Sequence, residues 1–509
     1  MKKILFIPLD ERPCNYFYPQ EMVGIRDDLQ LLVPSINLLG KKKTPANIEE
    51  IWKFVADHIS ECEAFVFSVE MMFYGGLLPS RLHHHSIEHF DSLLYKLEEL
   101  KKSNPNCRFY AFQLIMRTPR YSSDDEEPDY YGIYGEQIFK RSYLINKYNR
   151  IGISKEEQTE LESYNKLIPS NIIADYENRR GVNVRVNLKM VELVSKGIIE
   201  YLSIPQDDSC EFGYTAIDQQ SVVSAISELR LQRRVMMYPG ADEAGCEVLA
   251  RAISEMDQKV TKVFPFYASY LGPQIVPLYE DRIMIESLKS HLMVANCVIV
   301  DHKEDADFIL GINCPGKMMQ EAFDQDKKDI TYSSYRNLNW FVSTLKEDIN
   351  KGYKVVVADC AFSNGGDLEL IQLLDDYEIL DRLYSYKGWN THCNTLGTSI
   401  AQMVICNHIS INKDKVISSL IYHLLEDGFY QALLRKEVTS TLQEPLSYFD
   451  LCDQQESIVC IENQRLRQLY ENNIIHSFKS YKIDCIDVYH PWNRMFEIGV
   501  RLCVSSVAI

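Results

Sequence analysis

The sequence predicts an α/β fold in the form of a (β/α)8-like barrel, with an inserted helical cap and a C-terminal helical region closed by a β-hairpin. About eight apolar, β-branched runs have the length of strands, and helical stretches separate nearly all of them. Such alternation is typical of a parallel sheet covered by helices. Polar loops follow these runs, and a barrel gathers such loops at one face. Two doubly wound α/β domains with a cleft between them would give the same alternation, so this alternative stays open.

The predicted strands set the limits of the first domain. The first strand covers 3–8, the last covers 383–386, and a helix is expected near 395–406. In chain order the eight runs contain Ile4, Phe65, Phe109, Tyr201, Val235, Val263, Val355 and Tyr384. Residues 1–408 are therefore expected to form the α/β catalytic domain.

Two interruptions and a C-terminal region complete the predicted organisation. Residues of about 120–185 are rich in Tyr, Glu, Asn and Lys and predict a helical insertion, entered through an exposed acidic loop at 122–131. Residues of about 275–320 predict a small α/β excursion. The remainder, 409–509, is mostly helical in pattern, and two strand-like runs flank the loop 489–494. We expect these runs to form the closing hairpin.

Composition and charge argue against several classes of partner. The net charge is −18, and Lys41-Lys42-Lys43 is the only notable basic run. Nucleic acids and anionic membranes both reward a clustered positive face, so neither is expected to bind. A small neutral or cationic substrate fits better. No phosphate-binding glycine motif follows a strand, so no nucleotide cofactor is expected. Whether copies of the chain assemble into a homo-oligomer is left open.

The expected location is the cytoplasm. The first residues imitate a signal peptide, but Asp10 and its charged neighbours interrupt the apolar stretch too early. No apolar run reaches the roughly 18 residues of a membrane span. The 14 cysteines are scattered and contain no C-x-x-C pair, which favours reduced thiols. The adjacent histidines His83 to His85 are a poor metal site because neighbouring histidines rarely converge on one ion, so no metal is expected.

The leading catalytic candidates are two consecutive carboxylates, Asp207 and Asp208. They follow the apolar run 198–204, just past its carboxyl end. Neighbouring side chains on a strand point to opposite faces, so both acids serve one site only if the backbone leaves the strand, which Pro205 favours. Together they would raise each other's cost of ionisation, which suits one charged and one protonated role. The alternative is a turn that caps the helix predicted near 217–231.

A second group of candidates follows the strand predicted at 64–69. A carboxylate, a phenol and a guanidinium lie close together around a Gly-Gly bend, in Glu70, Tyr74 and Arg81. They form a plausible polar wall for a ligand. The alternative is a bend stabilised by an internal ion pair between Glu70 and Arg81.

Polar loops after other strands supply the remaining candidates. Trp389 offers a flat apolar wall, and the amides of Asn390 and Asn394 can both donate to and accept from neutral sugar hydroxyls. The alternative for this loop is a polar turn that caps the following helix. For Asp242 and Glu243, the alternative is an acidic first turn of a helix. The candidates in these loops are Asp10, Arg12, Asn15, Asp242, Glu243, Asn364, Asp367, Trp389, Asn390, Asn394 and Arg494.

Seven short motifs along the chain carry a resemblance to a bacterial family described only as a domain of unknown function. They span nearly the whole chain and imply no activity. The motifs are Pro8-Leu9-Asp10-Glu11-Arg12-Pro13, Tyr74-Gly75-Gly76-Leu77, Gln206-Asp207-Asp208, Gly240-Ala241-Asp242-Glu243, Asn364-Gly365-Gly366-Asp367, Gly388-Trp389-Asn390-Thr391 and Pro491-Trp492-Asn493-Arg494.

More remotely, a pair of aspartates after a fourth strand resembles the O-GlcNAcase and hyaluronidase group of retaining N-acetylhexosaminidases. The resemblance implies that Asp207 holds the substrate acetamide and that Asp208 protonates the leaving oxygen. It also implies sugar contacts for Trp389, Asn390 and Asn394. The Asp10 loop and the Asp242-Glu243 pair depart from the pattern of that group.

These features predict a glycoside hydrolase that cleaves a small neutral or N-acetylated sugar glycoside by carboxylate acid/base catalysis. Acetamide participation is one route, and direct attack by Glu243 is another. A metal-dependent hydrolase or sugar isomerase, with Asp10, Glu70, Asp207 and Asp242 as oxygen ligands, is a second hypothesis. A non-catalytic carbohydrate-binding protein is the third.

Overall fold

The computed structural model describes residues 1–507, which divide into two compact units. Unit 1 comprises 1–11, 30–252 and 279–281, and unit 2 comprises 12–29, 253–278 and the chain from 282 onward. This division differs from the predicted boundary after residue 408, because most of the chain between 253 and 408 packs with the C-terminal region. Each unit is built around its own sheet.

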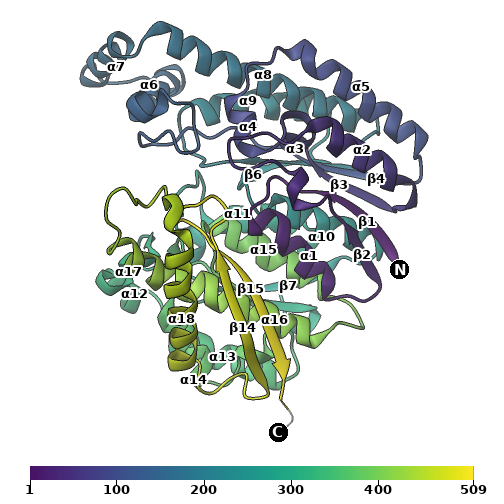
Figure 1. The fold of residues 1–509 in the computed structure, drawn as a ribbon, viewed down its shortest axis with the longest axis vertical. Helices are drawn as coiled ribbons and strands as arrows, with labels where there is room; N and C mark the ends of the chain where they lie inside the picture. The colour runs from purple at the N-terminus through teal and green to yellow at the C-terminus, as the bar shows by residue number, and fades with distance from the viewer. Residues whose placement is uncertain (508–509) are drawn as a thin grey trace. The chain divides into compact units, whose positions relative to one another are not determined.

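Unit 1 contains a six-stranded sheet with the order β2-β1-β3-β4-β5-β6 (Figure 1). Its strands are β1 (Lys2–Ile7), β2 (Leu29–Leu32), β3 (Ala64–Ser68), β4 (Arg108–Phe112), β5 (Tyr201–Gln206) and β6 (Val235–Pro239). From β1 to β6 the pairings are parallel, with Ile4 opposite Ala64 and Tyr110 opposite Tyr201. Every residue of β3 is buried, as expected where helices cover both faces of a parallel sheet.

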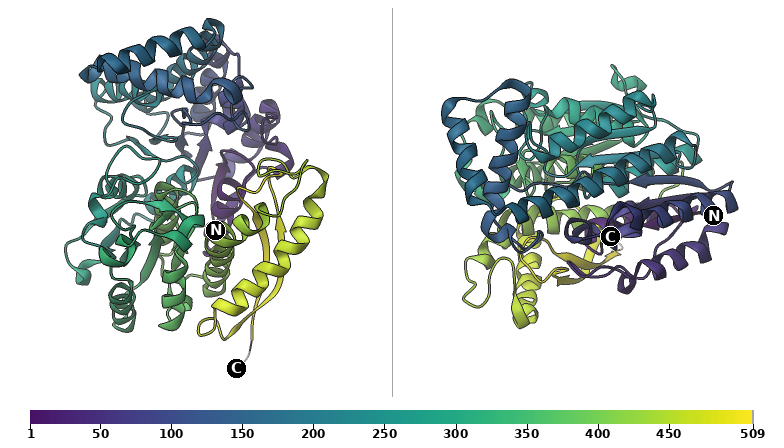
Figure 2. Two further views of the ribbon diagram at one scale, coloured as in Figure 1. Left: turned by 90° about the vertical axis from the view of Figure 1, so that its left-hand side faces the viewer. Right: turned by 90° about the horizontal axis from the view of Figure 1, so that it is seen from above.

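The helices of unit 1 connect these strands. They are α2 (Ile48–His58), α3 (Val69–Tyr74), α4 (Leu77–Leu82), α5 (Ile87–Ser103), α6 (Tyr131–Ile151), α7 (Lys155–Leu167), α8 (Ser170–Ser195), α9 (Tyr214–Glu228) and α10 (Ala244–Met256). Helices α6 to α8 form the predicted insertion, and Figure 2 shows them lying together at one end of the unit. The buried rings of Tyr131, Tyr176 and Tyr214 pack in one cluster beneath them, which ties the insertion to α9.

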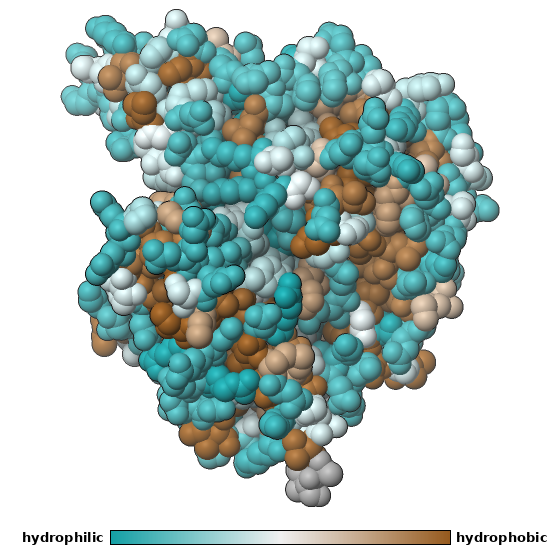
Figure 3. All heavy atoms as spheres, in the orientation of Figure 1, coloured by the Kyte–Doolittle hydropathy of each residue, from teal (hydrophilic) through white to brown (hydrophobic). Residues whose placement is uncertain are grey.

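The outer surface of the insertion is mostly hydrophilic, with scattered hydrophobic side chains (Figure 3). Ile133, Ile151 and Leu167 are exposed there. Single exposed apolar side chains are common on folded proteins and indicate no partner by themselves. Across residues 1–507, no helix has both the length and the hydropathy required to cross a membrane.

Unit 2 contains a five-stranded sheet with the order β13-β11-β9-β7-β8. Its strands are β7 (Thr261–Tyr267), β8 (Cys297–Ile299), β9 (Phe308–Asn313), β11 (Val355–Asp359) and β13 (Ser385–Lys387). All four pairings are parallel. Counted along the chain, the order is 2-1-3-4-5, which the first five strands of unit 1 also follow. In this order the chain reverses direction between the first and third strands, where ligands commonly bind outside the carboxyl ends.

The strand order favours the alternative architecture over the preferred one. The eight predicted strands divide between two sheets, and no closed barrel is detected among residues 1–507. A single barrel would require the strand at Val235 to lie in one sheet with the strand at Val263, but these are β6 and β7 of different sheets. The mixed α/β class with parallel sheets is confirmed, and the barrel is corrected to two open sheets of doubly wound order. The physical reason is that both architectures alternate strands and helices identically along the chain.

Helices and two short strands complete unit 2. They are α1 (Pro13–Gly24), α11 (Met284–Val294), α12 (Thr331–Ser334), α13 (Leu338–Asn350), α14 (Leu368–Asp376), α15 (His392–Ile405), α16 (Lys413–His423), a π-helix (Leu424–Leu434), α17 (Arg435–Thr439), α18 (Gln455–Asn473), β10 (Gln320–Glu321) and β12 (Phe362–Ser363). The C-terminal strands β14 (Tyr481–Tyr489) and β15 (Gly499–Ser506) pair antiparallel, and α18 lies beside them in Figures 1 and 2.

A disulfide joins the two C-terminal strands. It links Cys485 of β14 to Cys503 of β15. None of the other cysteines among the described residues forms a disulfide. The expectation of uniformly reduced thiols is therefore wrong for this pair, because the antiparallel pairing of the hairpin places the two residues directly opposite each other.

Candidate functional site

The connection from β3 through α3 to α4 positions three of the predicted residues. Ser68 begins α3 by accepting a hydrogen bond from the Met71 backbone N–H at 3.2 Å, which places Glu70 in the first turn. Gly75 ends α3 with a φ of +87°, a left-handed conformation that glycine adopts without a steric penalty. Helix α4 begins two residues later, and its last turn carries Arg81. Glu70, Tyr74 and Arg81 are all buried.

The end of β5 positions the two aspartates. The strand ends at Gln206, and the Asp207 backbone N–H donates to the Ile115 carbonyl at 3.3 Å. Asp208 then has a φ of +46°, which is uncommon for a residue with a side chain. The backbone thus leaves the strand between the two acids. This is the condition under which adjacent carboxylates can serve one site.

Two arginines, one buried and one half-buried, bind the aspartates. The Arg81 Nη2 lies 2.5 Å from the Asp207 Oδ2, and the Arg117 Nη1 lies 3.5 Å from the Asp208 Oδ2. Glu126 connects the two pairs, because its Oε2 lies 3.0 Å from the Arg81 Nη1 and 2.9 Å from the Arg117 Nη2. The side chains of both arginines are at most 12% exposed. The five side chains therefore form one charge network with limited access to water.

The loop that precedes α6 supplies Glu126 and also Glu127, whose Oε1 accepts from the Arg117 Nε at 2.8 Å. Glu127 is 1% exposed. Lys42 forms an ion pair with Asp125 in the same loop. The predicted exposed acidic loop at 122–131 is therefore partly buried, because its carboxylates neutralise the two arginines.

Two of the carboxyl groups near the arginines have raised pKa values. Burial, together with the charge of Asp207, raises the pKa of Asp208 to about 6, although 27% of its side chain remains exposed. Burial also raises the pKa of Glu70 to about 7, and the charge of Asp207 adds to the effect. The Glu70 Oε1 accepts from the Leu114 N–H at 2.7 Å, and its Oε2 accepts from the Ser68 hydroxyl at 3.1 Å. The ion pair between Glu70 and Arg81, which was the alternative for this segment, is thus replaced by these contacts and by the pair of Arg81 with Asp207.

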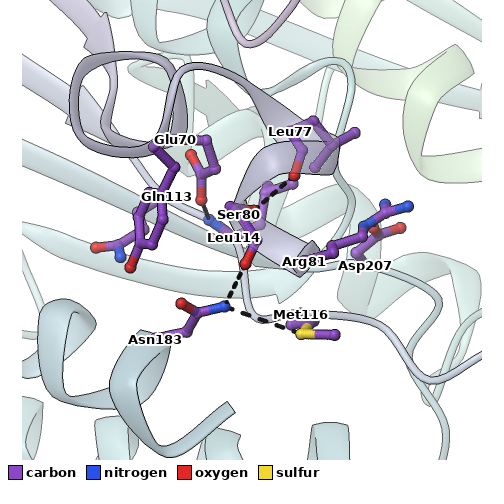
Figure 4. Close-up of a pocket in the computed structure, with 10 residues that line it drawn as sticks. Glu70, Leu77, Ser80, Arg81, Gln113, Leu114, Met116, Asn183 and Asp207 are labelled. Atoms are coloured by element: carbon purple, nitrogen blue, oxygen red, sulfur yellow. Dashed lines mark hydrogen bonds and ion pairs between the residues drawn. The ribbon is translucent and has the colours of Figure 1, made fainter. Parts of the chain in front are cut away.

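Glu70 and Asp207 line a narrow pocket in unit 1, and Asp208 lies next to Asp207 but outside the lining (Figure 4). Its interior has a volume of about 10 Å³, which is room for about one water molecule or one hydroxyl group, and it opens toward solvent. Its lining residues are Glu70, Tyr74, Leu77, Ser80, Arg81, Gln113, Leu114, Met116, Asn183 and Asp207. Figure 4 shows Glu70 and Gln113 on one side of the pocket, Arg81 and Asp207 on the other, and Asn183 and Met116 below them in this view. The pocket therefore lies at the carboxyl ends of the neighbouring strands β3, β4 and β5.

The other candidates of unit 1 follow β1 and β6. Asp10 is buried in the loop after β1, and Asp242 is buried in the loop after β6. Glu243 is fully buried, and its Oε2 accepts from the Ala241 N–H at 3.0 Å. None of the three belongs to the lining of the pocket.

Three candidates of unit 2 lie near the first helix and the C-terminal loop. Trp492 lies between two guanidinium groups, with the Arg12 Cζ 4.5 Å and the Arg494 Cζ 4.6 Å from its ring centroid. Arg494 is also 2.9 Å from a carboxylate oxygen of Glu497. Asn15 is buried in α1. Arg12 and Arg494 therefore both contact one indole ring, by the cation–π interaction.

Trp389 is buried and meets the ring of Tyr18 edge to face at 6.3 Å. Asn394 donates to the Thr391 hydroxyl at 2.6 Å. Among the described residues, the Trp389 Nε1 and the Asn394 Oδ1 have no hydrogen-bond partner. Asn390 has a φ of +59°, and its carbonyl accepts from the Asn364 N–H at 2.7 Å.

Asp367 has a structural role in unit 2. Its side chain caps α14 by accepting from the Glu369 N–H, and it lies 2.6 Å from the Arg336 Nη1. Asn364 donates to the Glu321 carboxylate at 2.8 Å. These contacts account for the polar atoms of both candidates without a ligand.

The structure thus brings four predicted residues, Glu70, Tyr74, Arg81 and Asp207, to one pocket, and it adds residues that the sequence did not indicate. Gln113 and Asn183 line the pocket, and Arg117, Glu126 and Glu127 complete the charge network. The position of Gln113 directly after the buried strand β4 is a sequence feature that indicates a site residue. Asn183 lies inside a long helix whose sequence gives no such signal.

Comparisons with known proteins give one family. A family model described as "Protein of unknown function (DUF4127)" matches residues 4–501. No curated protein matches the chain.

Proposed function

The chain belongs to this family of proteins of unknown function (DUF4127), and we propose that unit 1 hydrolyses a small neutral or N-acetylated sugar glycoside by carboxylate acid/base catalysis. The observation that carries the proposal is the different surroundings of two adjacent carboxyls. Asp207 lies 2.5 Å from Arg81, whereas Asp208 lies 3.5 Å from Arg117 and has a pKa raised to about 6 by burial and by Asp207. One charged and one protonated carboxyl are what glycoside hydrolysis requires.

The chemistry assigns one role to each acid. Protonated Asp208 transfers its proton to the glycosidic oxygen as the bond from that oxygen to the anomeric carbon breaks. The charged Asp207, fixed by Arg81, stabilises the positive charge that develops on the sugar. Water then adds to the anomeric carbon and returns a proton to Asp208. With an N-acetylated substrate, the acetamide oxygen can attack first, and Asp207 would orient it.

The charge of the network supports a neutral substrate. Two arginines face five carboxyl groups, so a bound anion would meet excess negative charge. The two arginines are Arg81 and Arg117, and the five carboxyl groups are those of Glu70, Glu126, Glu127, Asp207 and Asp208. An uncharged sugar avoids this cost.

A panel of aryl glycosides tests the proposal, with Asp208→Asn and Asp207→Asn as variants. Either substitution is expected to lower kcat by about 100-fold or more, because general acid catalysis alone contributes that much. In the unchanged protein, kcat should fall as the pH rises above about 6, since Asp208 loses its proton there. Asp218→Asn is the matched control, because Asp218 is a half-buried carboxylate paired with Arg180 at 2.6 Å and lies outside the pocket. Unchanged hydrolysis in both active-site variants would refute the assignment.

Two further arms of the assay separate the alternatives. Cleavage of a glycoside without an acetamide would favour direct attack by a carboxylate, such as Glu243, over acetamide participation. Loss of activity after dialysis against a chelator, restored by Mg²⁺ or Mn²⁺, would favour a metal-dependent hydrolase or isomerase. Saturable sugar binding with no turnover would favour a carbohydrate-binding protein.

A further inference from the structure

Three polar atoms in the lining of the unit 1 pocket have no partner. Within residues 1–507, the Tyr74 hydroxyl, the Arg81 Nε and the Gln113 Oε1 are buried and form no hydrogen bond. The three side chains are between 2% and 4% exposed. A buried polar atom without a partner costs about 1–3 kcal/mol, so three in one pocket indicate that something else supplies the bonds.

The hydrogen-bonding character of these atoms restricts what can bind. The Arg81 Nε can only donate, and the Gln113 Oε1 can only accept. The Tyr74 hydroxyl can do either. A ligand that satisfies all three must therefore carry both acceptors and donors in a small space. Hydroxyl groups meet this requirement, because each accepts and donates through one oxygen.

Charged ligands satisfy the three unpartnered atoms less well than hydroxyl groups do. An ammonium group has no acceptor for the Arg81 Nε, and it would lie beside the guanidinium charge of that residue. A carboxylate or phosphate has no donor for the Gln113 Oε1, and it would face Glu70 and Asp207 across the pocket. Both kinds of ligand would leave a buried polar atom unsatisfied.

From this arrangement we infer that Tyr74, Arg81 and Gln113 form a subsite that binds one hydroxyl group of a neutral, polyhydroxylated ligand. Tyr74 and Gln113 determine the specificity, since Arg81 is also held by Asp207 and Glu126. The inference deepens the proposed function and rests on it for the identity of the ligand as a substrate. The binding itself requires no turnover.

Two substitutions remove the polar atoms with little change in shape. Tyr74→Phe keeps the ring, which packs against His83 at 4.9 Å and Phe90 at 4.7 Å. Gln113→Leu keeps the backbone N–H that donates to the Ser203 carbonyl at 2.9 Å. The matched control is Tyr267→Phe, which removes a phenol hydroxyl in unit 2 that is also buried without a hydrogen-bond partner among the described residues.

The experiment measures binding to the full-length protein by calorimetry. The probes are the methyl glycosides of glucose, galactose, mannose and N-acetylglucosamine, with glucosamine and glucuronate as cationic and anionic probes. At least one neutral probe is expected to bind, and both charged probes should bind at least about tenfold more weakly. Tyr74→Phe and Gln113→Leu should each weaken that binding by about tenfold, as the loss of one hydrogen bond to a ligand predicts. Tyr267→Phe should leave it unchanged.

The outcomes separate this inference from the proposed function. Binding that depends on Tyr74 and Gln113 supports the subsite even if no glycoside is hydrolysed. Hydrolysis that depends on Asp208 but not on Tyr74 or Gln113 would overturn the subsite while leaving the proposed function intact. The inference is also overturned if no neutral probe binds up to its solubility limit while both variants raise the melting temperature. In that case the pocket holds only water.

Discussion

Replacing Glu70 with glutamine tests the electrostatics of the pocket directly. Glu70 is 3% exposed, and burial raises its pKa from an ordinary 4.5 to about 7. A difference of this size between the folded and unfolded states corresponds to about 3 kcal/mol of pH-dependent stability. Glutamine preserves the size of the side chain and its acceptor for the Leu114 N–H, but it carries no titrating proton.

The direction of the effect follows from the raised pKa. The folded state holds the Glu70 proton more tightly than the unfolded state does, so the stabilisation is complete below pH 4.5 and is lost as the pH rises through about 7. The unfolding free energy of the unchanged protein, measured relative to Glu70→Gln, should therefore decrease by about 3 kcal/mol between pH 4.5 and pH 8. The variant should be the more pH-tolerant protein.

Urea unfolding at a series of pH values measures this difference, and the signal must come from unit 1 alone. The chain has four tryptophans, of which Trp52 lies in unit 1 and the other three lie in unit 2. Fluorine NMR of fluorotryptophan-labelled protein resolves them separately. Glu136→Gln in α6 is the control, because Glu136 is 46% exposed and should show no pH-dependent difference. A difference between Glu70→Gln and the unchanged protein that stays constant across pH would refute the burial argument.

Two further predictions concern the charge network and the disulfide. Arg81→Leu leaves Asp207 without its arginine partner, while Glu126 keeps its contact with Arg117, and should cost unit 1 about 3–5 kcal/mol, part of which Asp207→Asn should restore in the double variant; additive effects in urea unfolding, followed at Trp52, would contradict the pairing. Cys503→Ser removes a cross-link between residues 18 apart and should lower the stability of unit 2 by about 3 kcal/mol. Dithiothreitol should produce the same loss in the unchanged protein and no further loss in the variant, and a stable reduced protein would count against this estimate.

The positions of the strands could be predicted from the sequence, but their partners could not. Apolar, β-branched runs around Phe65, Val235 and Val355 are strands because burial on both faces of a parallel sheet requires continuous hydrophobic sequence. Which strands pair depends on where each connecting helix packs. The order of strands and helices along the chain does not determine this pairing. This is why the barrel and the two open sheets were indistinguishable, and why the switch between the first and third strands was not anticipated.

The candidate site also contains residues that the sequence predicts and residues that it does not predict. Strand ends pointed to Glu70 and Asp207, since polar residues after a buried strand lie at the carboxyl edge of the sheet. Glu126 and Glu127 neutralise the arginines, but the sequence predicts an exposed acidic loop at 122–131, because a run of acids is normally solvated. Their burial depends on Arg117, which lies just beyond the end of β4 and whose charge requires nearby carboxylates. Long-range pairing of this kind leaves no local pattern.

The shared strand order of the two units offers an internal comparison for the pocket. In unit 2, the fourth strand of the order ends in the fully buried Asp359, and in unit 1 Gln113 lies one residue beyond the end of the fourth strand. Asp359 accepts hydrogen bonds from the Asn313 amide at 2.8 Å, the Asp367 N–H at 2.6 Å and the Tyr386 hydroxyl at 2.8 Å. Its oxygens are thus satisfied by protein alone.

The polar residues beyond the strand ends of unit 1 differ from Asp359. The Gln113 Oε1 and the Tyr74 hydroxyl, which line the same pocket, stay buried without partners among the described residues. A closed network would be the more stable arrangement if stability alone had determined these residues. The unsatisfied polar atoms at the carboxyl edge of the unit 1 sheet are the atoms whose hydrogen bonds the proposed hydroxyl-binding subsite would complete.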